Sequence, residues 1–234
     1  MNVLDRLWDH VHAIQPAPPA WVVGVTALAA LLLVLNTASW RLAGQVITIA
    51  HEGGHALVSV LSGRRLEGIR LHADSSGVTY SRGKRRGPGL VLTAAAGYVT
   101  PPLLGAGAAA LLAARHPAAL LWLALVLLAA TFLAVRNAFG ALAVLVTAAG
   151  VFAVSYYASA AVQAGFAYLA AWFLLLGGMR PALELTRRRR ASRSGLSDAD
   201  QLARLTGVSR SVWVAAFLLI ATAALALGAR LLIP

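Results

Sequence analysis

Long apolar segments alternate with short polar ones along almost the whole chain. A helix needs about 20 apolar residues to cross a lipid bilayer. The pattern therefore predicts an all-α polytopic membrane protein with about six to seven transmembrane helices in a single domain, residues 1–234. Gly97 and Pro101-Pro102 lie within the third span, and we expect them to kink or break it. The expected spans are residues 20–35, 40–61, 89–114, 118–135, 138–158, 165–179 and 211–232.

Three polar segments separate or precede these spans. Residues 1–19 combine charged residues, Trp8 and a proline-rich hinge, which is typical of a short interfacial segment. Residues 64–87 alternate apolar and polar positions around turn residues 74–77, and this pattern predicts a β-hairpin. An edge strand of this hairpin would suit an unwound substrate segment by strand addition, while a hairpin that only fills the loop is an equally open alternative. Residues 180–210 are the longest polar segment and are expected to form a basic loop.

Composition narrows the class of protein and of metal site. Hydrophobic residues make up 59% of the chain, and its mean hydropathy of +0.75 is far above that of soluble domains. Cysteine is absent, so a metal site must be built from His, Asp or Glu side chains. The net charge of +12 comes from cations in short loops. There they act as topology signals and contact lipid headgroups of the bilayer, so we expect no nucleic-acid partner.

The basic residues also predict an orientation. In a seven-span arrangement, 17 of the 20 Lys and Arg residues fall on the side of the N-terminus. Loops rich in Lys and Arg remain in the cytoplasm. We therefore expect the N-terminus, the hairpin and the 180–210 loop to be cytoplasmic, in a multi-pass protein of a bacterial cell membrane.

The sequence His51-Glu52-Gly53-Gly54-His55 lies within the second span and has well-defined chemistry. On a helix, residues four apart share a face, which allows His51 and His55 to bind one Zn²⁺. Glu52 projects about 100° away from His51 and is placed to act as the general base. Zinc lowers the pKa of the water it binds from about 16 towards about 7, so a carboxylate can take the proton as that water attacks a peptide carbonyl. The adjacent Gly53 and Gly54 predict that another helix or a substrate approaches this backbone closely.

Two histidines leave a hydrolytic zinc site one protein ligand short. Asp198 is the preferred third ligand, and Asp200 is the alternative. Capping of a helix over residues 199–205 by Ser197 or Asp198 is the other role open to this segment, and it accounts for one of the two aspartates. The remaining candidates are histidines: His72, which is best placed, and His10, His12 and His116.

These features resemble the site-2 protease family of intramembrane zinc metalloproteases. The likeness rests on the histidine motif in an early span, on the hairpin after it, and on the Ala-Gly-Tyr-Val-Thr-Pro-Pro sequence at residues 96–102. It covers about residues 40–215. The segments that look more narrowly like the small bacterial branch of the family are residues 136–140 and 197–203, with Thr206 and Trp213.

The resemblance implies a zinc ion bound by His51 and His55, with Glu52 as the catalytic base and cleavage of substrate helices within the membrane. Better-known members take their third ligand from an aspartate in an Asn-Pro-Asp-Gly-like motif. This chain lacks that motif. Asn137 is its nearest counterpart and a candidate substrate-binding residue.

The leading functional prediction is an intramembrane zinc metalloendopeptidase that acts on membrane-embedded proteins. One alternative is a catalytically inactive relative that binds membrane helices without cleaving them. The other is a small metal-handling membrane protein, for which several intramembrane acidic residues along a path are expected. Within the predicted spans, the sequence offers only Glu52.

Overall fold

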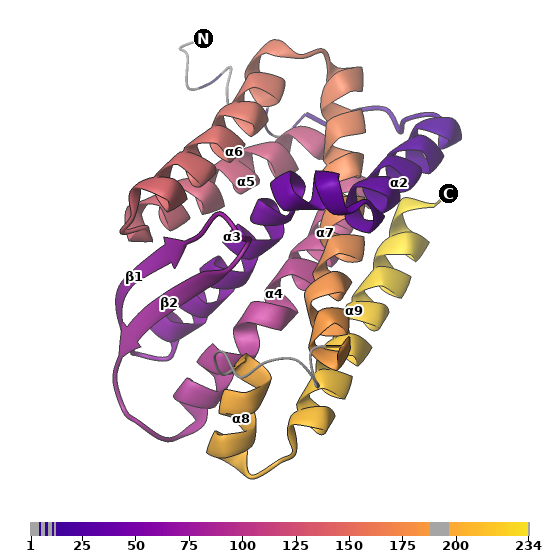
Figure 1. The fold of residues 1–234 in the computed structure, drawn as a ribbon. Coiled ribbons are helices and arrows are strands. Elements are labelled where there is room, and N and C mark those ends of the chain that lie inside the picture. The colour runs from indigo at the N-terminus through magenta and orange to yellow at the C-terminus, as the bar shows by residue number, and fades with distance from the viewer. Residues whose placement is uncertain (1–4, 6–7, 9–10, 12, 188–196, 234) are drawn as a thin grey trace.

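The computed structural model describes residues 5, 8, 11, 13–187 and 197–233. Over these residues the chain is a bundle of helices with one two-stranded sheet at its side (Figure 1). The predicted all-α polytopic class is confirmed. Nine of the nineteen residues in the predicted interfacial segment 1–19, including His10 and His12, lie outside the described residues. The elements are α2 (Ala20–Leu35), α3 (Thr37–Leu61), β1 (Arg65–Leu71), β2 (Gly77–Arg82), α4 (Pro88–Ala113), α5 (Pro117–Ala134), α6 (Ala138–Tyr157), α7 (Ala160–Arg187), α8 (Asp198–Thr206) and α9 (Arg210–Leu232).

Among the described helices, five are long and apolar enough to cross a membrane: α4, α5, α6, α7 and α9. Helices α2 and α3 pass the same test only together, and they meet at an angle of 102°. The count of spans in this part of the chain is therefore five, or six if the bent pair is one span. This count is one or two below the seven-span arrangement used to predict orientation, because hydropathy alone does not distinguish a bend from a loop between two spans.

The bend between α2 and α3 is built around Asn36. Its side-chain oxygen accepts hydrogen bonds from two backbone N–H groups in the first turn of α3, at 2.9 and 3.1 Å. Arg180 of α7 donates to the carbonyl of Val34 at the end of α2, and its guanidinium lies 4.5 Å from the centre of the Trp40 ring. Backbone groups freed by the bend are thus paired by protein, which a low-water environment requires.

Helix α4 continues without interruption through Pro101 and Pro102, so the expected break does not occur within it. Both prolines are fully buried. They pack against α7 at Gly178, where an added Cβ would lie 2.8 Å from Pro102 Cδ. Proline removes backbone hydrogen bonds from a helix. Close packing against α7 helps to keep α4 helical at these two positions.

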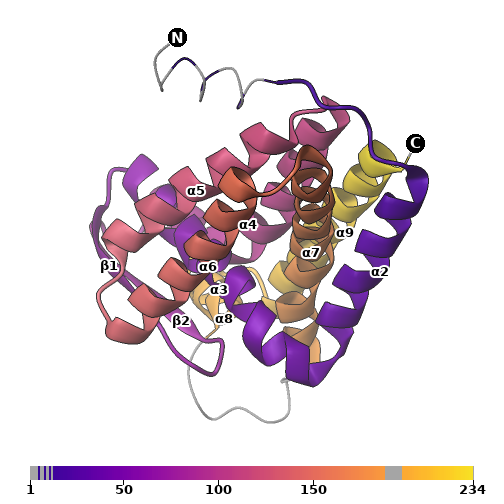
Figure 2. The ribbon, with the colours of Figure 1, turned by 90° about the horizontal axis from the view of Figure 1, so that it is seen from above.

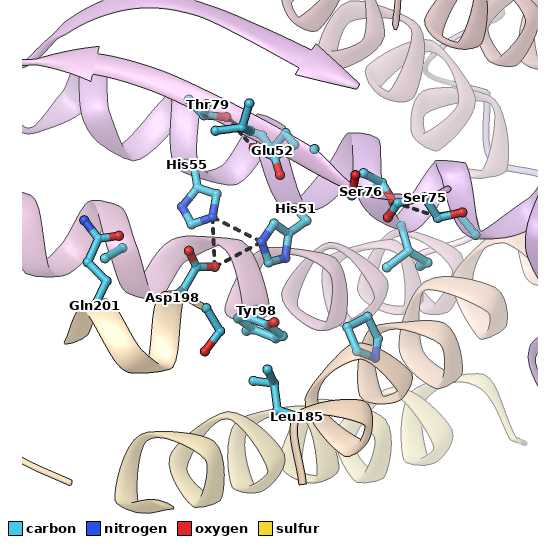
Figure 3. A pocket seen from close by; sticks show the side chains of 18 of the residues that line it. His51, Glu52, His55, Ser75, Ser76, Thr79, Tyr98, Leu185, Asp198 and Gln201 are labelled. Carbon is cyan, nitrogen blue, oxygen red and sulfur yellow. Dashed lines mark hydrogen bonds and ion pairs between the residues drawn. The ribbon is translucent and has the colours of Figure 1, made fainter. Parts of the chain in front are cut away.

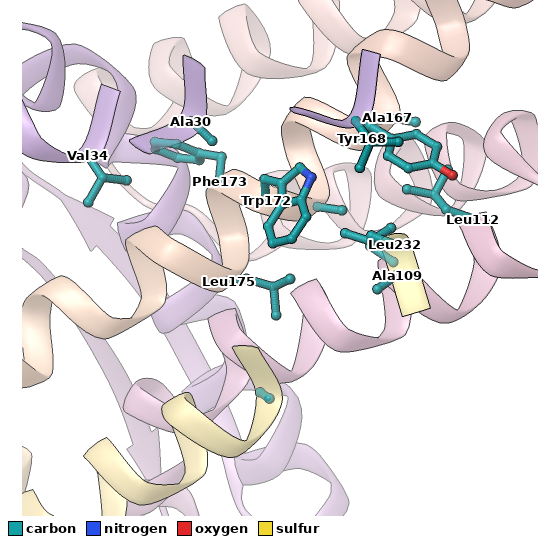
Figure 4. Packing of buried hydrophobic residues seen from close by; sticks show 14 of the residues in the cluster. Ala30, Val34, Ala109, Leu112, Ala167, Tyr168, Trp172, Phe173, Leu175 and Leu232 are labelled. Atoms are coloured by element: carbon teal, nitrogen blue, oxygen red, sulfur yellow. The ribbon is translucent and has the colours of Figure 1, made fainter. Parts of the chain in front are cut away.

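Helix α7 is the centre of the bundle. Viewed from above, it lies between α2 and α4, with α9 beside it (Figure 2). Its buried residues Trp172, Phe173 and Leu175 pack against Ala30 of α2 and Ala109 of α4 (Figure 4). The small residues on the neighbouring helices allow the close helix packing that is typical of membrane bundles.

The predicted hairpin is present as β1 and β2, which pair antiparallel with a bulge between Leu66 and Gly68. Ile69 and Leu71 are fully buried and Arg70 is exposed, as their alternation predicted. This alternation fixes one face of the hairpin against the bundle.

The outer edge of β1 is already occupied. Ile69 forms a parallel bridge with Val135, and the Asn137 side chain exchanges two hydrogen bonds with the backbone of Leu71, at 3.2 and 2.8 Å. These contacts attach the hairpin to the loop between α5 and α6. Strand β2 has no second strand partner among the described residues.

The N-terminal segment and the hairpin lie at opposite ends of α4. The hairpin leads into the first residue of α4, Pro88, whereas the backbone N–H of Gln15 donates to the carbonyl of Arg115, just beyond the other end. Figure 1 shows α8 near the start of α4, and the start of α2 and the end of α9 away from it. This arrangement differs from the predicted placement of both segments on one side, and it fits a single crossing by the bent pair α2 and α3.

Candidate metal centre

Three side chains that are distant in sequence meet at one point of the structure. His51 and His55 project from α3, and Asp198 is the first residue of α8. The Nε2 atoms of the two histidines are 3.1 Å apart, and each lies 3.2 Å from Asp198 Oδ2. In Figure 3 the carboxylate of Asp198 faces both imidazole rings. Among the described residues, this is the one group of three or more His, Cys, Asp or Glu side chains that can hold a metal ion.

The geometry of this triangle fits a tetrahedral metal of the size of zinc. Bonds of about 2.0–2.1 Å place the ligand atoms of a tetrahedral site about 3.3 Å apart. The observed separations of 3.1–3.2 Å between the Nε2 and Oδ2 atoms match one face of such a tetrahedron. Gly97 of α4 completes the space, since an added Cβ there would overlap the Nε2 atoms of His51 and His55. The donor atoms and the space around them therefore suit a metal ion.

The ring of His55 is held in the orientation that a metal ligand requires. Its Nδ1 lies 2.6 Å from the backbone carbonyl of Thr93 in α4. Nδ1–H donates to that carbonyl, so Nε2 remains free for a metal. The His51 ring contacts Tyr98 edge to face, with 4.8 Å between the ring centroids. Tyr98 in turn stacks on Phe217 of α9, with 4.9 Å between their centroids. Helix α4 thus supports both imidazoles.

Helix α8 begins at the position that delivers Asp198. Ser197 is its N-cap and accepts a hydrogen bond from the backbone N–H of Asp200. Asp200 returns the interaction by accepting from the backbone N–H of Ser197 at 3.1 Å, which completes a capping box. The predicted N-cap at Ser197 is confirmed, and it leaves the Asp198 side chain available to face the histidines.

The structure places Asp200, the alternative ligand, in a different role. Its Oδ2 is engaged by Ser197, and its Oδ1 lies 3.1 Å from Nε of Arg210 in α9. Arg210 also donates to the carbonyl of Leu185 at the end of α7. Asp200 therefore links the start of α8 to α7 and α9 and does not join the triangle.

The charge of Asp198 follows from its surroundings. Burial alone would raise the pKa of this carboxyl, but the hydrogen bonds and charges of His51 and His55 outweigh burial and hold the pKa below its usual range. This shift belongs to the metal-free state with cationic imidazoles, whereas a bound metal requires both Nε2 atoms to be unprotonated.

The other predicted candidates lie away from the triangle. His72 contacts Ser76 in the hairpin turn, with 3.3 Å between Nδ1 and Oγ, and His116 is the N-cap of α5. Asn137 is engaged with the backbone of Leu71. His10 and His12 lie outside the described residues. Of the predicted ligand candidates that the structure describes, only His51, His55 and Asp198 therefore lie together.

Glu52 is buried beside the triangle, with 4% of its surface exposed. Its Oε2 accepts a hydrogen bond from the hydroxyl of Thr79 in β2 at 2.6 Å. On the same helix, Gly54 faces α4, where an added Cβ would lie 2.6 Å from Thr100 Cβ and 3.1 Å from the Ala96 carbonyl. The close approach predicted from the paired glycines is confirmed at Gly54.

A cavity of about 1020 Å³ opens onto the triangle. It is bounded by α3, the hairpin, α4, α7 and α8, and its lining includes His51, Glu52, His55 and Asp198. The chain from residue 77 to 81 in β2 forms one wall. The triangle is therefore accessible from the cavity along β2.

Sequence reasoning missed some of the residues that shape this site. Gly97 was considered only for its effect on helix α4, although its place in the 96–102 motif was a usable signal. The contribution of Thr93 comes from its backbone carbonyl, so its side chain carried no signal. Thr79 and Arg210 act through contacts with residues far away in sequence.

A family model described as peptidase M50B-like matches residues 24–228, a range that includes the triangle, the hairpin and all of the helices from α3 to α8. The chain belongs to the peptidase M50B-like family. This membership agrees with the resemblance to site-2 proteases and identifies a metalloprotease family. Together with five to six candidate spans, it makes the chain an integral multi-pass membrane protein. No curated protein and no solved structure matches the chain.

Proposed function

We propose that the protein is an intramembrane zinc metalloendopeptidase that hydrolyses peptide bonds in or near transmembrane segments of other proteins. The observation that carries the proposal is the triangle of His51, His55 and Asp198, with 3.1–3.2 Å between donor atoms. Membership of the peptidase M50B-like family supports the same reaction class. The adjacent buried Glu52 supplies the base that hydrolysis needs.

In this proposal each residue has a separate task. His51, His55 and Asp198 would hold the zinc ion. Zinc, when bound, supplies Lewis acidity that activates water and polarises a peptide carbonyl. Glu52 takes the proton from the attacking water and then delivers it to the departing amine nitrogen as the C–N bond breaks. Thr93 keeps His55 in the tautomer that leaves Nε2 unprotonated.

The substrates are proposed to be membrane-embedded proteins that become extended at the cleavage site. Strand β2 lines the cavity, and among the described residues it lacks a second strand partner. The outer edge of β1 is instead taken by residues 135–137. An unwound substrate segment is therefore expected to pair with β2, which would place its backbone along the wall that leads to the metal.

The proposal is tested with purified, zinc-loaded protein in lipid vesicles and a set of tagged single-span membrane segments as substrates. We expect cleavage by the wild type, loss of cleavage with a zinc chelator, and recovery on addition of zinc. Glu52→Gln should retain zinc and lose cleavage, because an amide can hold water but cannot accept its proton. Mass spectrometry of the products would locate the cut in or near the membrane segment.

Two outcomes would replace this function with another. Wild-type protein that binds substrate segments but no zinc would be an inactive relative that binds membrane helices. Wild-type protein that binds zinc and moves it across vesicles without cutting any segment would be a metal-handling protein. Equal cleavage by the wild type and Glu52→Gln would remove Glu52 from the reaction.

A further inference from the structure

The hairpin contacts one face of α3 through a row of polar side chains. Gln45 donates to the carbonyl of His72 at 2.9 Å, and Thr48 donates to the carbonyl of Ser75 at 3.0 Å. Glu52 follows at the spacing of one helical turn and accepts from Thr79. Glu52 is thus both the proposed base and the last member of the row on which the hairpin docks.

The contact between Glu52 and β2 is closer than docking alone requires. The Thr79 hydroxyl lies 2.6 Å from Glu52 Oε2, a distance typical of a hydrogen bond between a hydroxyl and a carboxylate. At Gly77, an added Cβ would lie 2.6 Å from Cγ, 2.8 Å from Oε1 and 2.9 Å from Cδ of Glu52. The carboxylate therefore occupies the space that a side chain at position 77 would fill.

This arrangement uses the two carboxylate oxygens differently. Thr79 binds Oε2, which fixes the plane of the carboxylate and leaves lone pairs on Oε1 for a proton. A general base must lie within hydrogen-bond reach of the proton it takes, so its orientation matters as much as its identity. In Figure 3, Glu52 lies on the side of the histidines that faces β2.

We propose that β2 is part of the catalytic apparatus, with Thr79 as the positioning residue of Glu52 and Gly77 as the site whose missing side chain admits the carboxylate. This inference rests on the proposed function, since it assigns a partner to the proposed base. It also links binding to chemistry: a substrate segment paired with β2 would hold Thr79, and through it the base, in place.

The alternative is that Thr79 merely docks the hairpin, and Thr48 provides a matched control. Thr48→Val removes the hydroxyl that donates to the carbonyl of Ser75. Thr79→Val removes the hydroxyl that lies 2.6 Å from Oε2 and 3.1 Å from the backbone carbonyl oxygen of Glu52, and neither change alters the side-chain shape much. Only Thr79→Val removes a contact with Glu52. Thr79→Ser retains the hydroxyl and should rescue function.

Kinetics with a cleaved tagged segment, together with measurement of bound zinc, separate the two roles. We expect Thr79→Val to lower kcat by about 10–100-fold while KM and bound zinc stay at wild-type values. Thr79→Ser and Thr48→Val should stay within about threefold of wild-type kcat. Gly77→Ala should lower kcat as Thr79→Val does, because it displaces the carboxylate. A Thr79→Val enzyme with wild-type kcat, or an equal loss in Thr48→Val, would overturn the inference.

A second readout does not depend on activity. Thermal unfolding of metal-free wild type, Thr79→Val, Glu52→Ala and the double variant forms a double-mutant cycle. We expect the loss of stability in the double variant to be smaller than the sum of the single losses, and strict additivity would contradict a direct contact. If the wild-type protein holds zinc but cuts no segment, the proposed function is contradicted, and the role of Thr79 in catalysis is contradicted with it. A cleaving wild type with a fully active Thr79→Val would remove that role alone.

Discussion

A side chain at Gly97 and a metal ion on His55 exclude each other, because a Cβ on Gly97 would overlap His55 Nε2. We expect Gly97→Ala to lower zinc affinity by at least tenfold and to abolish proteolysis. Gly107 lies on the same helix, and an added Cβ there would meet no atom within 4 Å. Gly107→Ala is therefore the control, and it should keep zinc while stabilising α4 by about 0.5–1 kcal/mol. Zinc titration of both variants makes the comparison, and wild-type affinity in Gly97→Ala would exclude the metal position inferred here.

Removal of any member of the triangle should release the metal. His51→Ala, His55→Ala and Asp198→Ala each leave two protein ligands, which is too few for a stable hydrolytic zinc site. Asp74→Ala is a control, since this exposed carboxylate bonds Ser76 in the hairpin turn, away from the triangle. Zinc content after dialysis should fall in the first three variants and stay at the wild-type level in the fourth. If Asp198→Ala keeps its full zinc content, Asp198 is not a metal ligand and is only an acidic residue in the first turn of α8.

Asp200 is expected to act on the metal only through α8. Asp200→Asn weakens both the capping box with Ser197 and the ion pair with Arg210, so it should cost about 1 kcal/mol of stability. Because Asp198 is carried by the same helix turn, zinc affinity should fall by a smaller factor than in Asp198→Ala. Unfolding curves and zinc titration on the same samples test this. A loss of zinc as complete as in Asp198→Ala would return Asp200 to the list of ligands.

The position of Gln15 beside Arg115 changes the expected orientation. Most cations lie in the hairpin and in the segment joining α7 to α8, so these are the parts expected to face the cytoplasm. The start of α2 and the end of α9 should then face the opposite side. Single cysteines at Ala17 and Lys84 are suitable probes, because both positions are exposed and the chain has no native cysteine.

A membrane-impermeant thiol reagent applied from outside the cell should label the cysteine at position 17 and not the one at position 84. Labelling of both after the membrane is opened controls for reactivity. If both cysteines stay unlabelled from outside, α2 and α3 do not form one crossing.

Local patterns in the sequence predicted most of the fold. The start of α2 at Ala20 and the end of α3 at Leu61 coincide with the predicted span limits. The alternation of Ile69 and Leu71 with polar residues identified the hairpin, because the period of two is a local signal. His51 and His55 were predictable for the same reason, since a helix alone sets their spacing.

Features that depend on tertiary packing were not predictable in this way. Asn36 ends one helix and caps the next whether the chain turns back or bends by 102°, so the sequence did not distinguish two spans from one bent pair. Pro101 and Pro102 carried a strong signal for a break, yet packing against α7 maintains the helix. Asp198 was preferred over Asp200, but Asp200 stayed an open alternative, because only the capping box of α8 decides which carboxylate faces the histidines.

The separation of the ligands along the chain also affects how the protein is made. Asp198 follows His55 by 143 residues. At roughly 5–20 residues per second, the ribosome takes about 7–29 s to synthesise that length. During this interval His51 and His55 have been synthesised, but the ligand set is incomplete. A nascent or truncated chain that ends before α8 therefore lacks Asp198, and its candidate metal centre stays incomplete until synthesis is nearly finished.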